Sequence, residues 1–154
     1  MKKLICLILT VTCLLGLAAC GGNAGVTPDM KAVYSDMAGK LPAMEPFTAE
    51  AVLNAYGIKA EDCKQMVVSS YYDGAATAEI WLIEASDETA AEQIKTLAQN
   101  RLNSMGEQFR SYDAKAYHLV ENAQLITHGN CLALIVAEDA ASLTQIYNTA
   151  AQLN

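Results

Sequence analysis

The chain has 154 residues, of which 53% are hydrophobic, and it carries a formal net charge of −7 at pH 7. This length suits one domain with one hydrophobic core, and the apolar content excludes a disordered chain. The acidic balance argues against binding to nucleic acid and against electrostatic adhesion to anionic lipid.

The N-terminus has the pattern of an export signal. A short basic stretch precedes the apolar run Leu4–Ala19, which is shorter than the ~20 residues that a membrane-spanning helix needs. The run ends in Leu17-Ala18-Ala19-Cys20, which resembles the lipobox of bacterial lipoproteins. The resemblance implies that residues 1–19 are removed and that lipid on Cys20 anchors the chain to the extracytoplasmic face of the cell membrane. An ordinary secretory leader with a chance cysteine is the alternative.

The segment after the leader predicts a tether followed by one domain. Residues 20–28 are rich in glycine and carry few side chains that could pack, which favours a flexible linker. The remaining residues, 29–154, are then the single folded domain. Removal of the leader deletes Lys2 and Lys3 but no acidic residue, so the processed chain is more acidic than the full chain.

Two short helices are expected at the start of the domain. Thr27 and Pro28 are typical of the N-cap and first position of a helix, whose apolar stripe continues to Leu41. A second helix is expected between Thr48, a favourable N-cap, and Gly57, a favourable residue just beyond a helix end.

The strongest strand signal surrounds Asp73-Gly74. Apolar residues recur over Gln65–Tyr72 and again over Ala75–Ala85. An Asp-Gly pair between two such runs predicts a hairpin with a two-residue type I′ turn, which places Val68 opposite Glu79. Side chains then alternate between two faces, with Val67, Ile80 and Leu82 on one and Val68, Trp81 and Ile83 on the other.

The second half of the chain repeats the helix and hairpin pattern without a shared residue motif. A long helix is expected from Ser86 or Asp87 to about Tyr112. A second hairpin is expected from 117–128 and 131–138, with Gly129-Asn130 as its two-residue turn. A last helix is expected from Asp139 to the end of the chain.

The predicted order of elements is α-α-ββ-α-ββ-α. This order favours an α+β domain with an antiparallel four-stranded sheet made from two hairpins. Both sheet faces are partly apolar, so both require cover. We expect the third and last helices to cover one face, and the two N-terminal helices to cover part of the other unless it binds a partner.

Most of the chain, from about Thr48 to Gln152, resembles a known family. The residues that carry the likeness are Ala55-Tyr56-Gly57-Ile58, Tyr71-Tyr72-Asp73-Gly74, Glu79–Ala85, Ala123–Ile126 and Gly129-Asn130-Cys131. They resemble the small bacterial lipoproteins grouped as the domain of unknown function 4358. The resemblance implies an exported, lipid-anchored α+β domain and no established activity. Cys131 departs from the family pattern, which often has an aromatic residue there.

The motifs of common enzymes are absent from the sequence. It has no nucleophile elbow, P-loop or dinucleotide glycine fingerprint. His118 and His128 are ten residues apart on one proposed strand, about 33 Å, which is too far for them to share a metal. Glu79 and Glu84 have opposite strand parity, so they do not form a glycosidase pair. We therefore predict no cofactor, no metal site and no catalytic residue.

Two cysteines and a histidine leave alternatives open. Cys63 and Cys131 form a disulfide or remain two separate buried thiols, because the sequence does not give the distance between them. The turn at Gly129-Asn130 places His128 opposite Cys131, which either activates the thiol or merely flanks the turn.

Tyr72 and Trp81 are the residues that we expect to bind a partner if one sheet face is open, although strand aromatics commonly pack in a core. The leading hypothesis is a lipid-anchored binding module whose partner is a protein, cell-wall material or a small ligand. The alternatives are an envelope enzyme whose site forms only in the fold, and a regulator of a neighbouring membrane protein. A sheet covered on both faces would leave an interaction carried by loops.

Overall fold

The computed structural model describes residues 25–74 and 76–153, so the predicted leader 1–19 and the predicted lipid site Cys20 lie outside the described residues. Its order of elements confirms the predicted α+β class and adds one short helix, α5. The elements are α2 (Met30–Met37), η1 (Ala38–Lys40), α3 (Ala49–Tyr56), η2 (Ala60–Asp62), β1 (Cys63–Tyr72), β2 (Thr77–Ala85), α4 (Glu88–Phe109), α5 (Ala114–Glu121), β3 (Gln124–His128), β4 (Cys131–Val136) and α6 (Ala140–Ala151).

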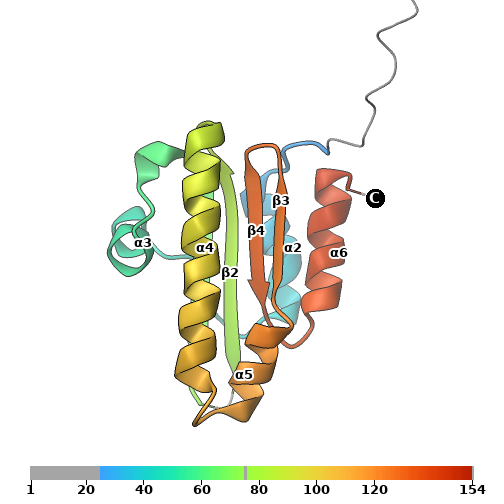
Figure 1. The fold of residues 1–154 in the computed structure, drawn as a ribbon. Helices are drawn as coiled ribbons and strands as arrows, with labels where there is room; N and C mark the ends of the chain where they lie inside the picture. Colours follow the sequence, from blue (N-terminus) through green and yellow to red (C-terminus); the bar gives the residue numbers. More distant parts are fainter. Residues whose placement is uncertain (1–24, 75, 154) are drawn as a thin grey trace, which may run out of the picture.

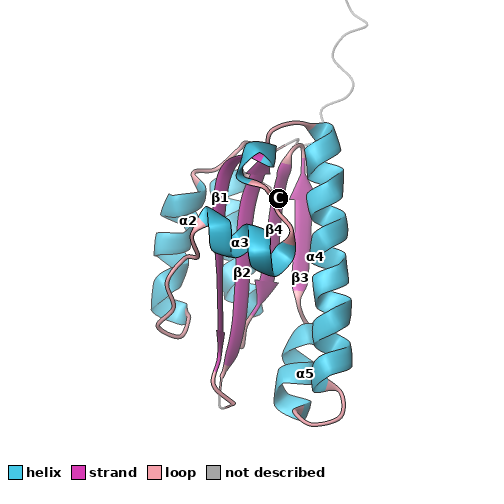
Figure 2. Cartoon of the chain, turned by 90° about the vertical axis from the view of Figure 1, so that its left-hand side faces the viewer, coloured by secondary structure: helices cyan, strands magenta, loops and turns pink. Residues whose placement is uncertain are grey.

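The strands form one four-stranded antiparallel sheet in the order β1-β2-β4-β3, with helices on both faces (Figures 1 and 2). One core lies between the sheet and α3, α4 and α5, and it includes Val52, Ile94 and Ala116. The other lies between the sheet and α2 and α6, and it includes Val33 and Leu143. We call these two sides of the sheet the α4 face and the α6 face.

The predicted distribution of helices over the two faces is wrong. The helices α4 and α6 were expected to share a face, but they lie on opposite faces of the sheet. Each helix carries an apolar stripe. Such a stripe indicates which side of the helix is buried, but not which face of the sheet the helix covers. The short connections that follow β2 and β4 decide the face, and they lead to opposite sides. Both faces are consequently covered.

The first hairpin has a longer turn than the sequence predicts. Tyr72 pairs with Thr77 and Val68 pairs with Trp81, which is a shift of two residues from the predicted pairing of Val68 with Glu79. The Asp73 carboxylate accepts a hydrogen bond from the backbone N–H of Ala76 at 2.8 Å, and this bond closes a loop of four residues. Because strand side chains alternate with a period of two, the shift leaves the predicted faces unchanged.

The second hairpin has the predicted two-residue turn, with His128 opposite Cys131, but its first strand is shorter than expected. The strand starts at Gln124 rather than at Tyr117. The preceding residues form α5, whose N-cap Asp113 accepts a hydrogen bond from the backbone N–H of Ala116 at 2.9 Å. This cap satisfies a helix terminus that the apolar spacing alone did not indicate.

The last residues of the predicted tether, 25–28, are held against the domain. The backbone N–H of Val26 donates to the carbonyl of Ala151 at 2.8 Å, and Pro28 is buried and accepts a hydrogen bond from the Gln65 side chain at 3.2 Å. The first helix accordingly starts later than predicted, with Asp29 rather than Thr27 as its N-cap. Over the described part of the chain, we find no helix whose length and apolarity would let it cross a membrane.

Candidate functional site

Trp81, one of the two predicted partner-binding residues, lies in the core of the α4 face. Its side chain is fully buried, and its ring packs against Tyr56 with centroids 4.9 Å apart. The indole N–H donates to Glu79 Oε1 at 2.9 Å, which satisfies its single donor. A partner that approaches the folded domain therefore cannot contact Trp81.

Glu79 is a buried carboxylate next to Trp81, and Arg101 neutralises its charge. The guanidinium of Arg101 forms a two-pronged pair with the carboxylate, with Nε 2.9 Å from Oε1 and the terminal nitrogen 2.7 Å from Oε2. Burial acts to lower the pKa of Arg101, but the hydrogen bonds and charge of Glu79 outweigh it and raise that pKa. With three donors on its two oxygens, the carboxylate is a structural anchor rather than a free base.

The two cysteines are free thiols on opposite sides of the sheet. Cys63 packs against the α4 face and Cys131 against the α6 face, with β2 between their strands, so the arrangement does not form the disulfide. Burial is the main reason why the pKa of Cys63 is raised to about 11 and why the pKa of Cys131 is also raised. A raised thiol pKa leaves little thiolate at neutral pH, which disfavours nucleophilic chemistry at either residue.

His128 does lie opposite Cys131, but its ring is engaged elsewhere. Its Nε2 is 3.0 Å from the hydroxyl of Tyr147, and burial lowers the pKa of the imidazole. A neutral imidazole held by Tyr147 does not stabilise a neighbouring thiolate. The other histidine, His118, is on α5 and not on the predicted strand.

Tyr72, the other predicted partner-binding residue, is exposed in a cluster of aromatic side chains at one end of the domain. It is the last residue of β1 and is 49% exposed, and Tyr112, in the loop between α4 and α5, is 59% exposed. Both rings pack on buried Phe109, with centroid distances of 5.3 Å for Tyr72 and 5.8 Å for Tyr112. We call this group, together with Asp73 and Asp113, the aromatic pole.

Carboxylates order two hydroxyl groups at this end of the domain, and the Tyr112 hydroxyl accepts a hydrogen bond from the Gln108 side chain at 3.2 Å. The Tyr72 hydroxyl is 3.4 Å from Asp113 Oδ2, and the neighbouring Tyr71 hydroxyl donates to Asp73 Oδ2 at 2.7 Å. The pKa of Tyr72 is raised, first by desolvation and then by Tyr112 and Asp113. Tyr72 therefore remains a neutral hydrogen-bonding group with an exposed ring, which is the combination that recognition surfaces favour.

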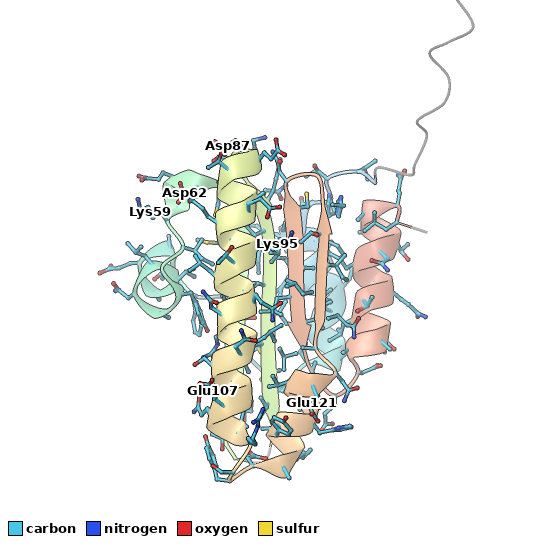
Figure 3. All side chains as sticks on the ribbon, viewed as in Figure 1. Lys59, Asp62, Asp87, Lys95, Glu107 and Glu121 are labelled. Carbon is cyan, nitrogen blue, oxygen red and sulfur yellow. The ribbon has the colours of Figure 1, made fainter. Side chains whose placement is uncertain are left out.

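The aromatic pole lies at the end of the domain opposite the entry of the chain. Figure 1 shows the N-terminal segment entering beside the C-terminal end of α6, whereas the β1–β2 turn and the α4–α5 loop are at the far end. Figure 3 shows Asp62 and Asp87 at the entry end, and Glu107 and Glu121 towards the opposite end. Strand β1, with 10 residues, spans about 33 Å between the two ends.

Sequence reasoning found Tyr72 but missed its partners. Phe109, Tyr112 and Asp113 come from a helix end and a loop, and Asp113 is 41 residues from Tyr72. Their contact depends on the lengths of β1 and α4, which bring the β1–β2 turn and the α4–α5 loop to the same end of the domain. Within residues 25–74 and 76–153, no group of three or more His, Cys, Asp or Glu side chains is placed to hold a metal ion.

Comparison with known proteins identifies the family to which the sequence belongs. The sequence profile of a family described as a domain of unknown function, DUF4358, matches residues 37–137, which is more than half of the chain. The chain belongs to the DUF4358 family. The match confirms the resemblance found in the sequence, and the motifs of that resemblance include the first hairpin and the buried Glu79 and Trp81. No curated protein and no solved structure matches the chain.

Proposed function

We propose that this member of the DUF4358 family is a lipid-anchored binding module on the extracytoplasmic face of the cell membrane, and that its aromatic pole contacts a macromolecule of the envelope. The observation that carries the proposal is the pair of exposed tyrosines, Tyr72 and Tyr112, at the end opposite the entry of the chain. A lipid on Cys20 would hold the entry end at the membrane and direct the aromatic pole away from it.

The geometry of the tether supports this orientation. Because residues 25–28 are bonded to the domain, only the chain between Cys20 and Gly25 separates the lipid from the fold. Five residues span at most about 17 Å, so the entry end stays close to the membrane. Export followed by acylation is also the interpretation that the pattern of residues 1–20 favours.

The exposure of the pole supports a large partner rather than a small ligand. Both sheet faces are covered by helices, so the core offers no open sheet surface. The side chains of Tyr72 and Tyr112 are instead exposed at one end of the domain, where Asp113 accepts a hydrogen bond from Tyr72 and Asp73 accepts one from the neighbouring Tyr71. Aromatic rings with satisfied polar edges anchor protein and glycan surfaces without needing a deep pocket.

The anchor is tested by metabolic labelling with palmitate in a bacterial host that carries out lipoprotein processing. The chain should be labelled and should float with membranes, whereas Cys20→Ala should abolish the label and release the protein. Equal labelling of the two proteins would exclude acylation at Cys20. The buried cysteine variant Cys131→Ala is a matched control, and we expect it to be labelled like the unchanged protein.

The binding role is tested by cross-linking the lipidated protein in cells and by sedimentation with purified cell wall. Replacing both tyrosines, Tyr72→Ala and Tyr112→Ala, should lower partner capture about tenfold. The ring-preserving pair Tyr72→Phe and Tyr112→Phe should retain most of it. Leu53→Ala removes a comparably exposed apolar side chain from α3, at 44% exposure, and should have no effect. Unchanged capture by the double alanine variant would contradict the proposal, whichever partner is captured.

A further inference from the structure

The two edge strands of the sheet, β1 and β3, differ in how they are protected from pairing with another chain. An edge strand exposes unpaired N–H and C=O groups, and natural proteins block such edges with charges, proline, bulges or a covering segment. Strand β1 has several of these protections. It carries Lys64 and a bulge at that residue. The N–H of Phe47 donates to the carbonyl of Val68 at 2.8 Å, which covers the middle of the strand.

Strand β3 lacks these protections over the described part of the chain, although it is short. It consists of Gln124–His128, which contains no acidic residue, lysine, arginine or proline. Its register with β4 is unbroken, and the sheet order gives it no second neighbouring strand among the described residues. Ile126 and Thr127 are β-branched, which favours extended backbone. The edge of β3 is therefore open to a further strand.

The register of the second hairpin determines which backbone groups of β3 point outward. Residues that flank a two-residue turn form a hydrogen-bonded pair, and such pairs alternate with non-bonded pairs along the strands. His128 and Cys131 flank the turn, so His128 and every second residue before it bond to β4. The N–H and C=O groups of Leu125 and Thr127 consequently point away from the sheet. Among the described residues, no other element forms a backbone hydrogen bond with either residue.

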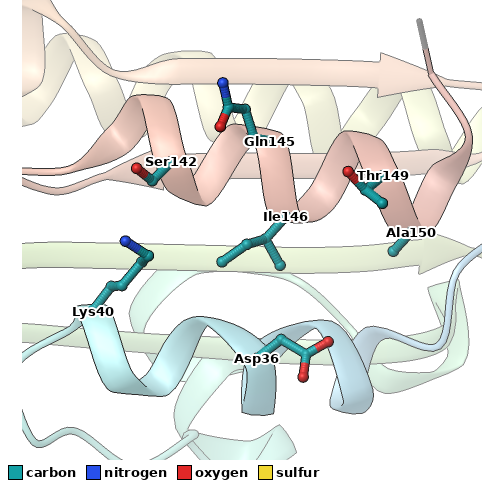
Figure 4. Close-up of a pocket in the computed structure, with 7 residues that line it drawn as sticks. All are labelled: Asp36, Lys40, Ser142, Gln145, Ile146, Thr149 and Ala150. Atoms are coloured by element: carbon teal, nitrogen blue, oxygen red, sulfur yellow. The ribbon is translucent and has the colours of Figure 1, made fainter.

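Hollows lie beside β3 on both sides of the sheet. One, of about 130 Å³, lies between β3 and α4 and is lined by Thr127 and Lys95. The other, of about 560 Å³, lies between the start of β3, α5 and α6 and is lined by Gln124 and Gln145. Figure 4 shows Gln145 extending from α6 on the side away from α2. Because side chains of a strand alternate between faces, those of an added strand would enter the two hollows in turn.

The surroundings of this edge favour an uncharged strand. Leu125, on the α4 face, and Ile126, on the α6 face, are only partly buried, so an added strand would complete their burial. Helix α6 has no charged residue, and Lys95 of α4 is paired with Glu92 at 3.3 Å. A charged side chain brought to this edge would lose hydration without gaining a free counter-charge.

We propose that β3 is a docking edge for an extended, uncharged segment of another protein, which adds a fifth strand to the sheet through the outward backbone groups of Leu125 and Thr127. Strand addition draws affinity from main-chain hydrogen bonds and specificity from pockets for alternate side chains, and β3 offers both. A second copy fits less well. A symmetric pair of β3 strands is antiparallel, so it joins two chains of net charge −7 with their entry ends pointing in opposite directions.

The test measures amide hydrogen exchange of the full chain, purified in detergent, with a synthetic strand as the probe. The probe is an acetylated and amidated hexapeptide of alternating threonine and valine. At saturating probe, exchange at the amides of Leu125 and Thr127 should slow about tenfold, whereas the Ile126 amide, which bonds to β4, should be unchanged. A control hexapeptide with the same side chains, methylated on every backbone nitrogen, should have no effect because it has no donors.

Two variants at one position separate main-chain from side-chain recognition. Thr127→Pro removes the outward N–H and should abolish the protection of Leu125, whereas Thr127→Val keeps the N–H and should retain it. Proline is tolerated where a strand N–H faces outward, so Thr127→Pro should remain folded in thermal unfolding. Ile126→Pro removes an N–H that bonds to β4 and should be strongly destabilised.

The outcomes are distinct from those that test the proposed function. No slowing by the probe, or equal slowing by the methylated peptide, would overturn the docking edge, and both results come from the unchanged chain. A dimer of the chain alone that Thr127→Pro dissociates would also overturn it, because the edge would then serve a second copy. None of the residues of the aromatic pole is on β3, so partner capture by the tyrosine variants reports that site separately.

Discussion

Helices cover both faces of the sheet, but the two faces differ in whether their buried polar atoms have hydrogen-bond partners among the described residues. On the α4 face, the buried carboxylate of Glu79 has its oxygens filled by Arg101 and the Trp81 indole. On the α6 face, buried Ser69 Oγ has no hydrogen-bond partner among the described residues, and neither have Thr144 Oγ1 and Asn148 Oδ1 on α6 itself. Both faces are therefore held by apolar packing, but the α4 face adds a satisfied ion pair, whereas the α6 face contains polar atoms without a described partner.

The largest expected effect is the loss of the ion pair on the α4 face. Arg101→Ala leaves the carboxylate of Glu79, which is 1% exposed, without a counter-charge. Breaking a buried pair from one side costs about 4 kcal/mol of unfolding free energy. Urea denaturation measures this loss, and Lys95→Ala on the exposed side of α4 should change stability by less than about 0.5 kcal/mol. Similar stabilities for the two variants would show that the pair contributes little to the fold.

A smaller effect is expected from removing an apolar contact on the α6 face. Leu143 is fully buried between α6 and the sheet, and Leu143→Ala should reduce stability by about 3 kcal/mol through lost burial and the cavity that remains. Leu53→Ala, at an exposed site on α3, is the matched control and should be close to neutral. If Leu143→Ala were as close to neutral as the control, α6 would not depend on this packing.

The smallest expected effect has the opposite sign. Ser69→Ala on the α6 face removes a buried hydroxyl that has no partner among the described residues. Removing an unsatisfied polar group saves its desolvation cost, so the variant should be equal to or up to about 1 kcal/mol more stable than the unchanged protein. Ser70→Ala, the next residue along β1 on the other face, serves as the comparison. A clear loss of stability in Ser69→Ala alone would mean that the hydroxyl has a partner.

Local patterns predicted most of the fold because caps, turns and apolar periods are local. Thr48 and Gly57 bound α3 as expected, and Gly129-Asn130 forms the expected turn. Apart from the distribution of helices over the two faces, two errors arose where a side chain altered a local preference. Asp73 lengthened the first turn through its bond to Ala76, and Asp113 capped a helix where a strand was expected.

The candidate site was less predictable because its contacts join distant parts of the sequence. Trp81 and Tyr72 both fitted a partner-binding role by residue type, but the register and the position of α4 determine that one is buried and the other exposed. Arg101 lies 22 residues after Glu79, and nothing in its neighbourhood marks it as the partner of a buried acid. Sequence patterns indicate which residues can pack or bind, and the tertiary arrangement decides which of them do.

The bond from Val26 to Ala151 brings the first and last described parts of the chain together. A protein fused to either of these parts would therefore lie close to the other. A fluorescent protein fused after the C-terminus would sit beside the point where the chain leaves for Cys20, and it would crowd the bilayer in an anchored molecule. A short epitope inserted at Gly74, in the β1–β2 turn, would instead mark the far end. The two labels, read by an antibody applied outside intact cells, would report which end of the domain is within reach.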